Sequence, residues 1–132
     1  MVKITFIRHG VKEYENNKGP YGSYQHDPDI KDFQNTIVFD LYNKNKFKQI
    51  VCSPYKRTRN TAMKIKELLE KNDIYVDLII EPLAAEYLGN QRPRGHYADV
   101  DPETFSLFEP KLGVENIAML KKRLRTFKNK LV

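Results

Sequence analysis

Short runs of β-branched and aromatic residues alternate along this chain with stretches whose apolar residues fall at helical spacing. In chain order the pattern predicts a strand over 2–7, a helix over 33–43, a strand over 48–52, a helix from Ser53-Pro54 to Asn72-Asp73, a strand over 74–80, and a helix from about 114 to the end. The stretches 10–32 and 89–113 lack a period and are predicted to be irregular. This alternation is typical of an α/β layered fold with a mostly parallel sheet.

Two of the predicted helices carry the clearest signals. Ser53 is a good N-cap, and Pro54 suits the first helical position because the N–H that it lacks has no helical partner there. The buried stripe of that helix is predicted to be Ala62, Ile65 and Leu69. The apolar residues of the last helix follow helical spacing throughout: Ile117, Leu120, Leu124, Phe127 and Leu131.

The composition is ordinary for a globular protein, apart from an excess of positive charge. A net charge of +6 attracts anions, phosphorylated substrates among them. Cys52 is the only cysteine, which excludes an intrachain disulfide and favours a reducing compartment. The start of the chain shows no signal peptide, and no apolar stretch approaches the roughly 18 residues of a membrane span. We therefore expect one soluble, cytoplasmic domain over residues 1–132 with no membrane contact.

The first predicted strand ends in a cluster of polar residues. Ligands of α/β sheets bind beyond the carboxyl ends of the strands, so chemistry is expected there. Arg8 offers a planar fork that fits phosphate oxygens, and His9 can act as a nucleophile or a base. Gly10 would allow the backbone to turn sharply and approach a ligand.

The second and third predicted strands also end in charged residues. Lys56, Arg57 and Arg59 stand in the first turns of a helix, where the helix dipole favours negative charge. A bound anion would remove that conflict, so the pattern indicates an anion site. The third strand leads to Glu81 and Glu86, and either carboxylic acid could protonate a leaving alkoxide.

Taken together, these motifs resemble those of the histidine phosphatase superfamily, the phosphoglycerate mutase-like proteins. The resemblance is carried by Ile4-Thr5-Phe6-Ile7-Arg8-His9-Gly10, by Val51-Cys52-Ser53-Pro54-Tyr55-Lys56-Arg57-Thr58-Arg59-Asn60-Thr61-Ala62, by Glu81-Pro82-Leu83 through Glu86 and Gly89, and by the helix from Gly113. It spans nearly the whole chain and is weak over 11–47 and 90–112. It implies a three-layer αβα fold with a mostly parallel sheet.

The resemblance implies a phosphatase or mutase with His9, Glu86, Arg8 and Arg57 as catalytic residues. His9 would take up the phosphoryl group, and Glu86 would donate a proton to the leaving group. Arg8 and Arg57 would bind the phosphate oxygens. Phosphoryl transfer needs mainly positioning and positive charge, which agrees with these residue types. Arg59 matches a variable position and is assigned no role.

Two further residues are expected to bind substrate. Lys12 stands where many members carry Thr or Ser, and its charge could replace that contact to phosphate. Arg92 lies in a stretch where members build substrate specificity. We expect a small phosphorylated substrate or a phosphoprotein as partner, and no cofactor. Three scattered histidines and one cysteine predict no metal site.

The chain departs from the family at its C-terminal end. The family pairs its nucleophile with a second histidine on a strand after the last helix. This chain ends at Leu131-Val132, about where that strand would begin, and His26 and His96 match no family position. We therefore expect the N-terminal portion of such a domain, incomplete at its C-terminus. Its open sheet edge could pair with another copy and form a homo-oligomer.

The favoured function is hydrolysis of a phosphomonoester through a phosphohistidine on His9, but other functions stay open. Without a second histidine, the chain could be a catalytically weak or inactive phosphate-binding module. A cysteine phosphatase on Cys52 is disfavoured, because Arg57 and Arg59 do not follow it at the required spacing. Nucleic-acid binding is disfavoured as well, since no recognised motif and no interleaving of aromatic and basic residues is present.

Overall fold

The computed structural model of this chain describes residues 3–12, 29–84, 102–107 and 117–131. Its elements, in chain order, are β1 (Val11–Lys12), β2 (Ile30–Asp32), α1 (Thr36–Asn45), β3 (Gln49–Cys52), α2 (Lys56–Glu70), β4 (Asp77–Ile80), the 3₁₀ turn η1 (Pro82–Ala84), α3 (Pro102–Leu107) and α4 (Ile117–Leu131). The strands form two small sheets, in which β1 pairs antiparallel with β2 and β3 pairs parallel with β4. None of the described helices is long and apolar enough to cross a membrane.

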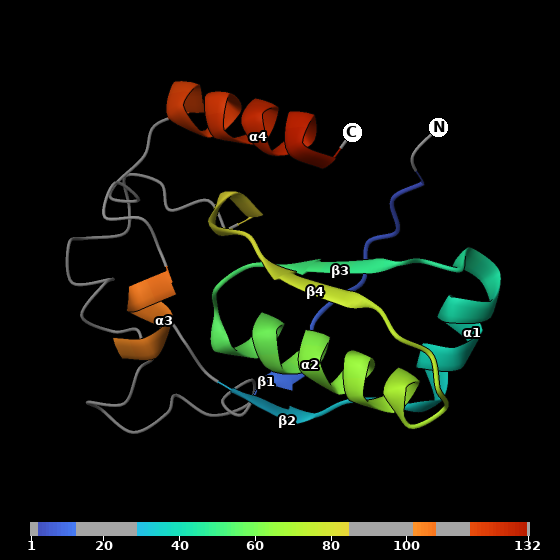
Figure 1. The fold of residues 1–132 in the computed structure, drawn as a ribbon. Coiled ribbons are helices and arrows are strands. Elements are labelled where there is room, and N and C mark those ends of the chain that lie inside the picture. The colour runs from blue at the N-terminus through green and yellow to red at the C-terminus, as the bar shows by residue number, and fades with distance from the viewer. Residues whose placement is uncertain (1–2, 13–28, 85–101, 108–116, 132) are drawn as a thin grey trace.

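The parallel pair β3–β4 lies between helical layers. The pair is in register from Gln49 opposite Asp77 to Cys52 opposite Ile80, and α2 connects the two strands along the chain. Figure 1 shows α2 on one side of the pair and α4 on the other. Because a parallel pair needs such a crossover helix, the alternation in the sequence predicted this unit correctly. The predicted α/β fold is confirmed.

The apolar stripe of α2 builds the core. Ala62, Ile65 and Leu69 are buried, as their spacing predicted, and Leu69 is wholly inaccessible to solvent. Ile65 and Leu69 pack in one cluster with Val38 of α1 and Val76 next to β4. Burying an aliphatic side chain of this size contributes about 1.5–3 kcal/mol, so this cluster holds α1, α2 and the strands together.

The start of α2 differs from the predicted one. The helix begins at Lys56 with Tyr55 as its N-cap residue, whereas Ser53 and Pro54 belong to the turn that leaves β3. The Ser53 hydroxyl is hydrogen-bonded to the Thr58 hydroxyl at 2.7 Å. The prediction of Ser53 as the N-cap was therefore wrong, because the helix begins three residues later and the Ser53 hydroxyl bonds the side chain of Thr58 in α2.

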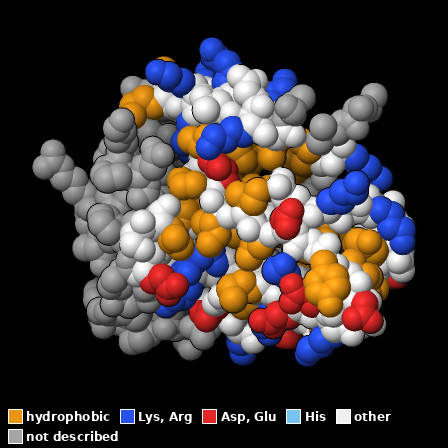
Figure 2. All heavy atoms as spheres, in the orientation of Figure 1, with side chains coloured by type: hydrophobic (Ala, Val, Ile, Leu, Met, Phe, Trp, Pro, Cys, Tyr) orange, Lys and Arg blue, Asp and Glu red, His pale blue; other side chains and the backbone are white. Residues whose placement is uncertain are grey.

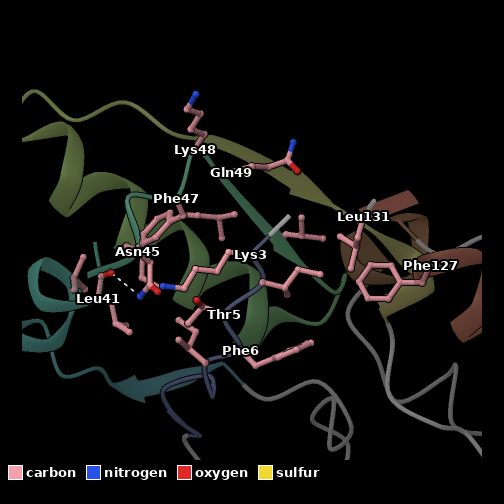
Figure 3. Close-up of a pocket in the computed structure, with 16 residues that line it drawn as sticks. Lys3, Thr5, Phe6, Leu41, Asn45, Phe47, Lys48, Gln49, Phe127 and Leu131 are labelled. Carbon is pink, nitrogen blue, oxygen red and sulfur yellow. Dashed lines mark hydrogen bonds between the residues drawn. The ribbon is translucent and has the colours of Figure 1, made fainter. Parts of the chain in front are cut away.

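The predicted first strand does not form. Residues 3–10 have no regular structure, and the chain enters a strand only at β1, where it pairs with β2 through an irregular register. A strand exists only with a hydrogen-bonded neighbour, so β-branched composition alone cannot make one. Residues 3–7 instead line an apolar cavity whose far wall includes β3 (Figure 3).

Several other boundaries moved. The helix predicted over 33–43 forms as α1, shifted by two to three residues to Thr36–Asn45, and the last helix forms as α4. β4 begins three residues after the predicted start at 74. The stretch 89–113 was predicted to be irregular, yet it contains the short helix α3. The two strands β1 and β2 likewise lie within the predicted loop 10–32.

α4 is fastened to the turn η1 by polar contacts. The buried Arg123 donates a hydrogen bond from Nη1 to the Leu83 carbonyl at 2.8 Å, and Lys130 pairs with Glu81 at 3.3 Å. Figure 2 shows Lys and Arg side chains gathered on α4 and apolar side chains exposed across the strands beneath it. Two residues of β4, Ile79 and Ile80, are exposed. α4 therefore covers the strands only in part.

Candidate functional site

One hydroxyl joins the segment Arg8-His9-Gly10 to the start of α2. The Gly10 amide donates to Thr61 Oγ1 at 2.9 Å, and Thr61 Oγ1 donates to the Arg57 carbonyl at 2.7 Å. Thr61 is 3% exposed; its hydrogen bond from Gly10 is buried, and the one to Arg57 is partly buried. The structure thus brings together two of the predicted motifs, which are some fifty residues apart in the chain.

Gly10 is needed for a close backbone approach. A Cβ atom at this position would lie 2.5 Å from the carbonyl oxygen of Asp32 and 3.3 Å from a methyl carbon of Ile30. The close approach is therefore to β2, and not to a ligand as the sequence had suggested. Packing against β2 on one side and Thr61 on the other fixes where His9 stands.

The ring of His9 is oriented by its neighbour. His9 Nδ1 lies 2.7 Å from the Gly10 carbonyl oxygen. Because a carbonyl oxygen only accepts hydrogen bonds, Nδ1 must carry the proton. In the neutral ring Nε2 then holds the free lone pair, which is the nucleophilic form of the side chain. His9 is half-buried, and the neighbouring Arg8 is exposed.

The N-terminal end of α2 concentrates positive charge beside this segment. Arg57 is half-buried, and its guanidinium carbon lies 4.6 Å from the centre of the buried Tyr55 ring. Stacking on an aromatic face holds a guanidinium in place while its N–H groups can still bind an anion. The first turn of α2 holds no acidic residue, so the helix dipole and the cations would both attract an anion at this end of the helix.

Cys52 is unsuited to nucleophilic chemistry. It ends β3 and is 8% exposed. Burial raises the pKa of its thiol from 9.0 to about 11, although the charge of Arg59 acts in the opposite direction. The thiolate is the reactive form, so at neutral pH this side chain is inert. The cysteine-phosphatase alternative therefore loses its nucleophile.

An apolar cavity lies apart from these polar groups. It has a volume of about 400 Å³ and is lined by residues 3–7, by residues of α1 and β3, and by Phe127 and Leu131 of α4 (Figure 3). Neither His9 nor Arg57 lines it. The cavity is thus separate from the cationic site at the start of α2.

The comparison with protein families agrees with the motifs at this site. The model of the histidine phosphatase superfamily (branch 1) matches residues 4–132. The chain belongs to the histidine phosphatase superfamily. No curated protein and no solved structure matches it. Since the superfamily includes phosphatases and mutases, membership supports phosphoryl transfer as the general chemistry.

Several residues predicted for the histidine phosphatase site lie outside the described part of the chain. These are Glu86 and Arg92, together with the unmatched His26 and His96. The backbone of Lys12 lies in β1, but its side chain is likewise outside the description. The roles predicted for these side chains therefore stay predictions.

Glu81, the other candidate acid, is engaged elsewhere. Its side chain is 12% exposed, pairs with Lys130 of α4 and accepts a hydrogen bond from the Leu83 amide at 3.2 Å. Through these contacts Glu81 helps to hold α4 in place.

Among the described residues, no group of three or more His, Cys, Asp or Glu side chains could hold a metal ion.

Thr61 is the residue of this site that the sequence interpretation missed. Within the helical pattern it looked like one of several polar residues of α2. One signal was available, because it lies four residues after Arg57 and next to the buried Ala62. A threonine on that face can bond back to the carbonyl four residues earlier and still accept a hydrogen bond.

Proposed function

We propose that this histidine phosphatase superfamily member hydrolyses a phosphomonoester through a phosphohistidine on His9. The supporting observation is the Thr61 hydroxyl, which ties the backbone next to His9 to the backbone of Arg57. The nucleophile and a cation are thereby held on one scaffold, which positioning-based catalysis requires. A small phosphorylated molecule or a phosphoprotein would be the substrate.

In the first step Nε2 of His9 attacks phosphorus, and the bond from phosphorus to the ester oxygen breaks. The leaving oxygen takes a proton from Glu86, the acid that the family motif assigns. Arg8, Arg57 and Lys12 stabilise the charge on the other phosphate oxygens. The orientation of the His9 ring supports this step, because Nδ1 faces the Gly10 carbonyl and leaves Nε2 for the substrate.

In the second step water attacks the phosphohistidine and the bond between phosphorus and nitrogen breaks. Glu86, now a carboxylate, takes a proton from the water, and orthophosphate leaves. Splitting the transfer in this way replaces one difficult displacement by two easier ones. Arg92 would contact the organic part of the substrate.

Binding of orthovanadate tests the site without requiring turnover. Calorimetry should show binding to the wild type and a loss of roughly tenfold or more in affinity for Arg57→Ala, since a charge-assisted hydrogen bond to phosphate contributes on the order of 1.5–3 kcal/mol. Lys56→Ala is the matched control, because it removes the adjacent cation of the same helix. Equal heats for wild type and Arg57→Ala would contradict the proposed site.

Covalent labelling tests the intermediate. A labelled phosphomonoester should leave an acid-labile, base-stable label on the wild type and none on His9→Ala. Vanadate binding without any label or turnover would instead favour the alternative of a phosphate-binding module. Turnover that persists in His9→Ala would remove His9 as nucleophile.

A further inference from the structure

The excess positive charge of the chain is concentrated on α4. The chain holds 23 Lys and Arg residues against 17 Asp and Glu, and six of those cations stand on this one helix, which contains no acidic residue. The rest of the chain is therefore neutral, and the whole net charge of +6 belongs to α4. Charge confined to a single element creates a local field that attracts anionic partners. Figure 2 shows Lys and Arg side chains along this helix at the top of the molecule.

Only two of the six cations hold the helix in place. Arg123 is buried and donates to the Leu83 carbonyl, and Lys130 pairs with Glu81. The other four are exposed and form no ion pair with another described residue: Lys121, Lys122, Arg125 and Lys128. The helix dipole favours cations only in the last turn, which holds Lys128 and Lys130. The positive charge nearer the start of the helix is therefore not explained by the stability of α4.

The charge of α4 also differs from that of an ordinary solvated helix. A helix face that only meets water normally carries both signs of charge. α2 is such a helix, because it contains lysines and glutamates, and Lys66 pairs with Glu70 four residues later at 2.9 Å. On α4 the neighbours at that spacing repel each other, since Lys121 and Arg125 are both cations. An anionic partner lying across the helix would relieve that repulsion.

Two of the exposed cations alternate with apolar residues in one stripe. Four exposed residues at spacings of four, three and four share one side of the helix: Ile117, Lys121, Leu124 and Lys128. Ile117 is 54% exposed and Leu124 is 47% exposed. At 1.5 Å per residue this stripe is roughly 16 Å long. Its complement is a segment in which acidic and apolar residues alternate in the same way.

The apolar residues of the stripe distinguish among anionic partners. A phosphate backbone would leave Ile117 and Leu124 uncovered, and single-stranded nucleic acid stacks on exposed aromatic rings, whereas the aromatic residue of α4, Phe127, is half-buried. A helix that binds a membrane surface inserts its main apolar face. That face of α4 is turned to the protein, where Leu120, Phe127 and Leu131 are half-buried. An acidic protein segment matches both the cations and the apolar residues between them.

We propose that the exposed face of α4 is a docking surface for an acidic protein segment whose carboxylates alternate with apolar side chains. The lysines pair with the carboxylates, and Ile117 and Leu124 contact the apolar side chains between them. Charge attraction raises the rate of encounter, and the apolar contacts select which acidic segment stays bound. The surface shares no residue with the phosphate site, so the inference does not rest on the proposed reaction.

Two synthetic peptides separate the charge from the apolar contacts. Both are helical and carry the same number of glutamates, with leucines between the glutamates in one peptide and serines in the other. Fluorescence anisotropy should show that the wild type binds the leucine peptide about tenfold more tightly, and that added salt weakens both complexes. Leu124→Gln should remove most of this preference and keep the affinity for the serine peptide within about twofold.

Charge variants provide the matched control. Lys121→Gln combined with Lys128→Gln should weaken the binding of both peptides roughly fivefold, because two exposed ion pairs are lost. Lys64→Gln combined with Lys71→Gln removes the same charge from exposed positions of α2 and its C-cap, and should leave both affinities within about twofold. Circular dichroism should show the helix content of the wild type in every variant.

The proposal is supported if Leu124→Gln loses the preference for the leucine peptide and if the charge dependence is confined to α4. A wild type that binds neither peptide, or that binds both equally, would overturn it. Equal losses in the two double variants would show that net charge alone attracts the peptides. Tighter binding to phosphatidylserine vesicles or to DNA than to the leucine peptide would assign this face to a lipid surface or to nucleic acid instead.

Discussion

At the scale of single residues, Thr61 offers the sharpest test of how the site is assembled. Replacing it with Val keeps the shape but leaves the buried Gly10 amide without an acceptor. We expect the free energy of unfolding to fall by about 1–3 kcal/mol, measured by urea denaturation, and vanadate affinity to fall with it. Thr61→Ser keeps the hydroxyl and should stay close to wild type. A Val variant as stable as the Ser variant would show that this hydroxyl does not hold His9 and Arg57 together.

Burial of Cys52 makes the folding stability of the protein fall at alkaline pH. Below pH 9 the thiol is protonated in both the folded and the unfolded chain. Between pH 9.0 and about 11 the unfolded chain loses its proton first, so folding stability falls as the pH rises. The total loss is on the order of 2–3 kcal/mol. Denaturant titrations of Cys52→Ala over this range should show a flatter profile, and a slope as steep as that of the wild type would contradict the assignment.

The sequence identified single residues by their chemistry, and it missed residues that act through packing. His9 and Arg57 stood out because an imidazole and a guanidinium followed predicted strands. Thr61 and Arg59 did not, because a hydroxyl or a cation within a helical pattern is usually solvated surface. Only the folded chain shows that both are buried.

At the scale of elements, the attachment of α4 depends on one buried cation. Arg123 is 7% exposed and donates to the Leu83 carbonyl, whereas Arg125 on the same helix is exposed. Arg123→Met should lower the free energy of unfolding by about 1–3 kcal/mol, because it removes the donor from a partly buried carbonyl. Arg125→Met is the matched control and should change it by less than about 0.5 kcal/mol. Equal effects of the two variants in urea denaturation would show that Arg123 does not fasten α4.

Elements with many periods were predictable, and short ones were not. α2 and α4 each repeat their apolar spacing over 15 residues, which is enough to predict both helices and the buried face of α2. It does not predict the buried face of α4, where Ile117 and Leu124 are exposed and Arg123 is buried. α3 has six residues, too few for a period, and it is held by a hydrogen bond from Arg59 of α2. The prediction of a first strand failed for a different reason, and residues 3–10 have no regular structure. A strand needs a hydrogen-bonded neighbour, and its own sequence does not show whether that neighbour exists.

At the scale of the whole molecule, the predicted layering holds, while among the described strands neither outer edge of the β3–β4 sheet is paired. Among the described strands, β3 pairs only with β4. On its other side lies the apolar cavity, bordered by residues 3–7, where Phe6 is 85% exposed (Figure 3). An unpaired edge beside exposed apolar side chains is a site at which chains associate.

We therefore expect the protein to associate with itself at this edge as its concentration rises. Analytical ultracentrifugation over a dilution series should show a shift from monomer to larger species. Phe6→Lys should suppress the shift, because a charge at the cavity mouth must be desolvated when a second copy covers it. Tyr75→Lys is the matched control, since Tyr75 is a similarly exposed aromatic residue, at 74%, that does not line the cavity. If both variants suppress association equally, general surface hydrophobicity is the cause, and if neither does, the open edge is not where copies meet.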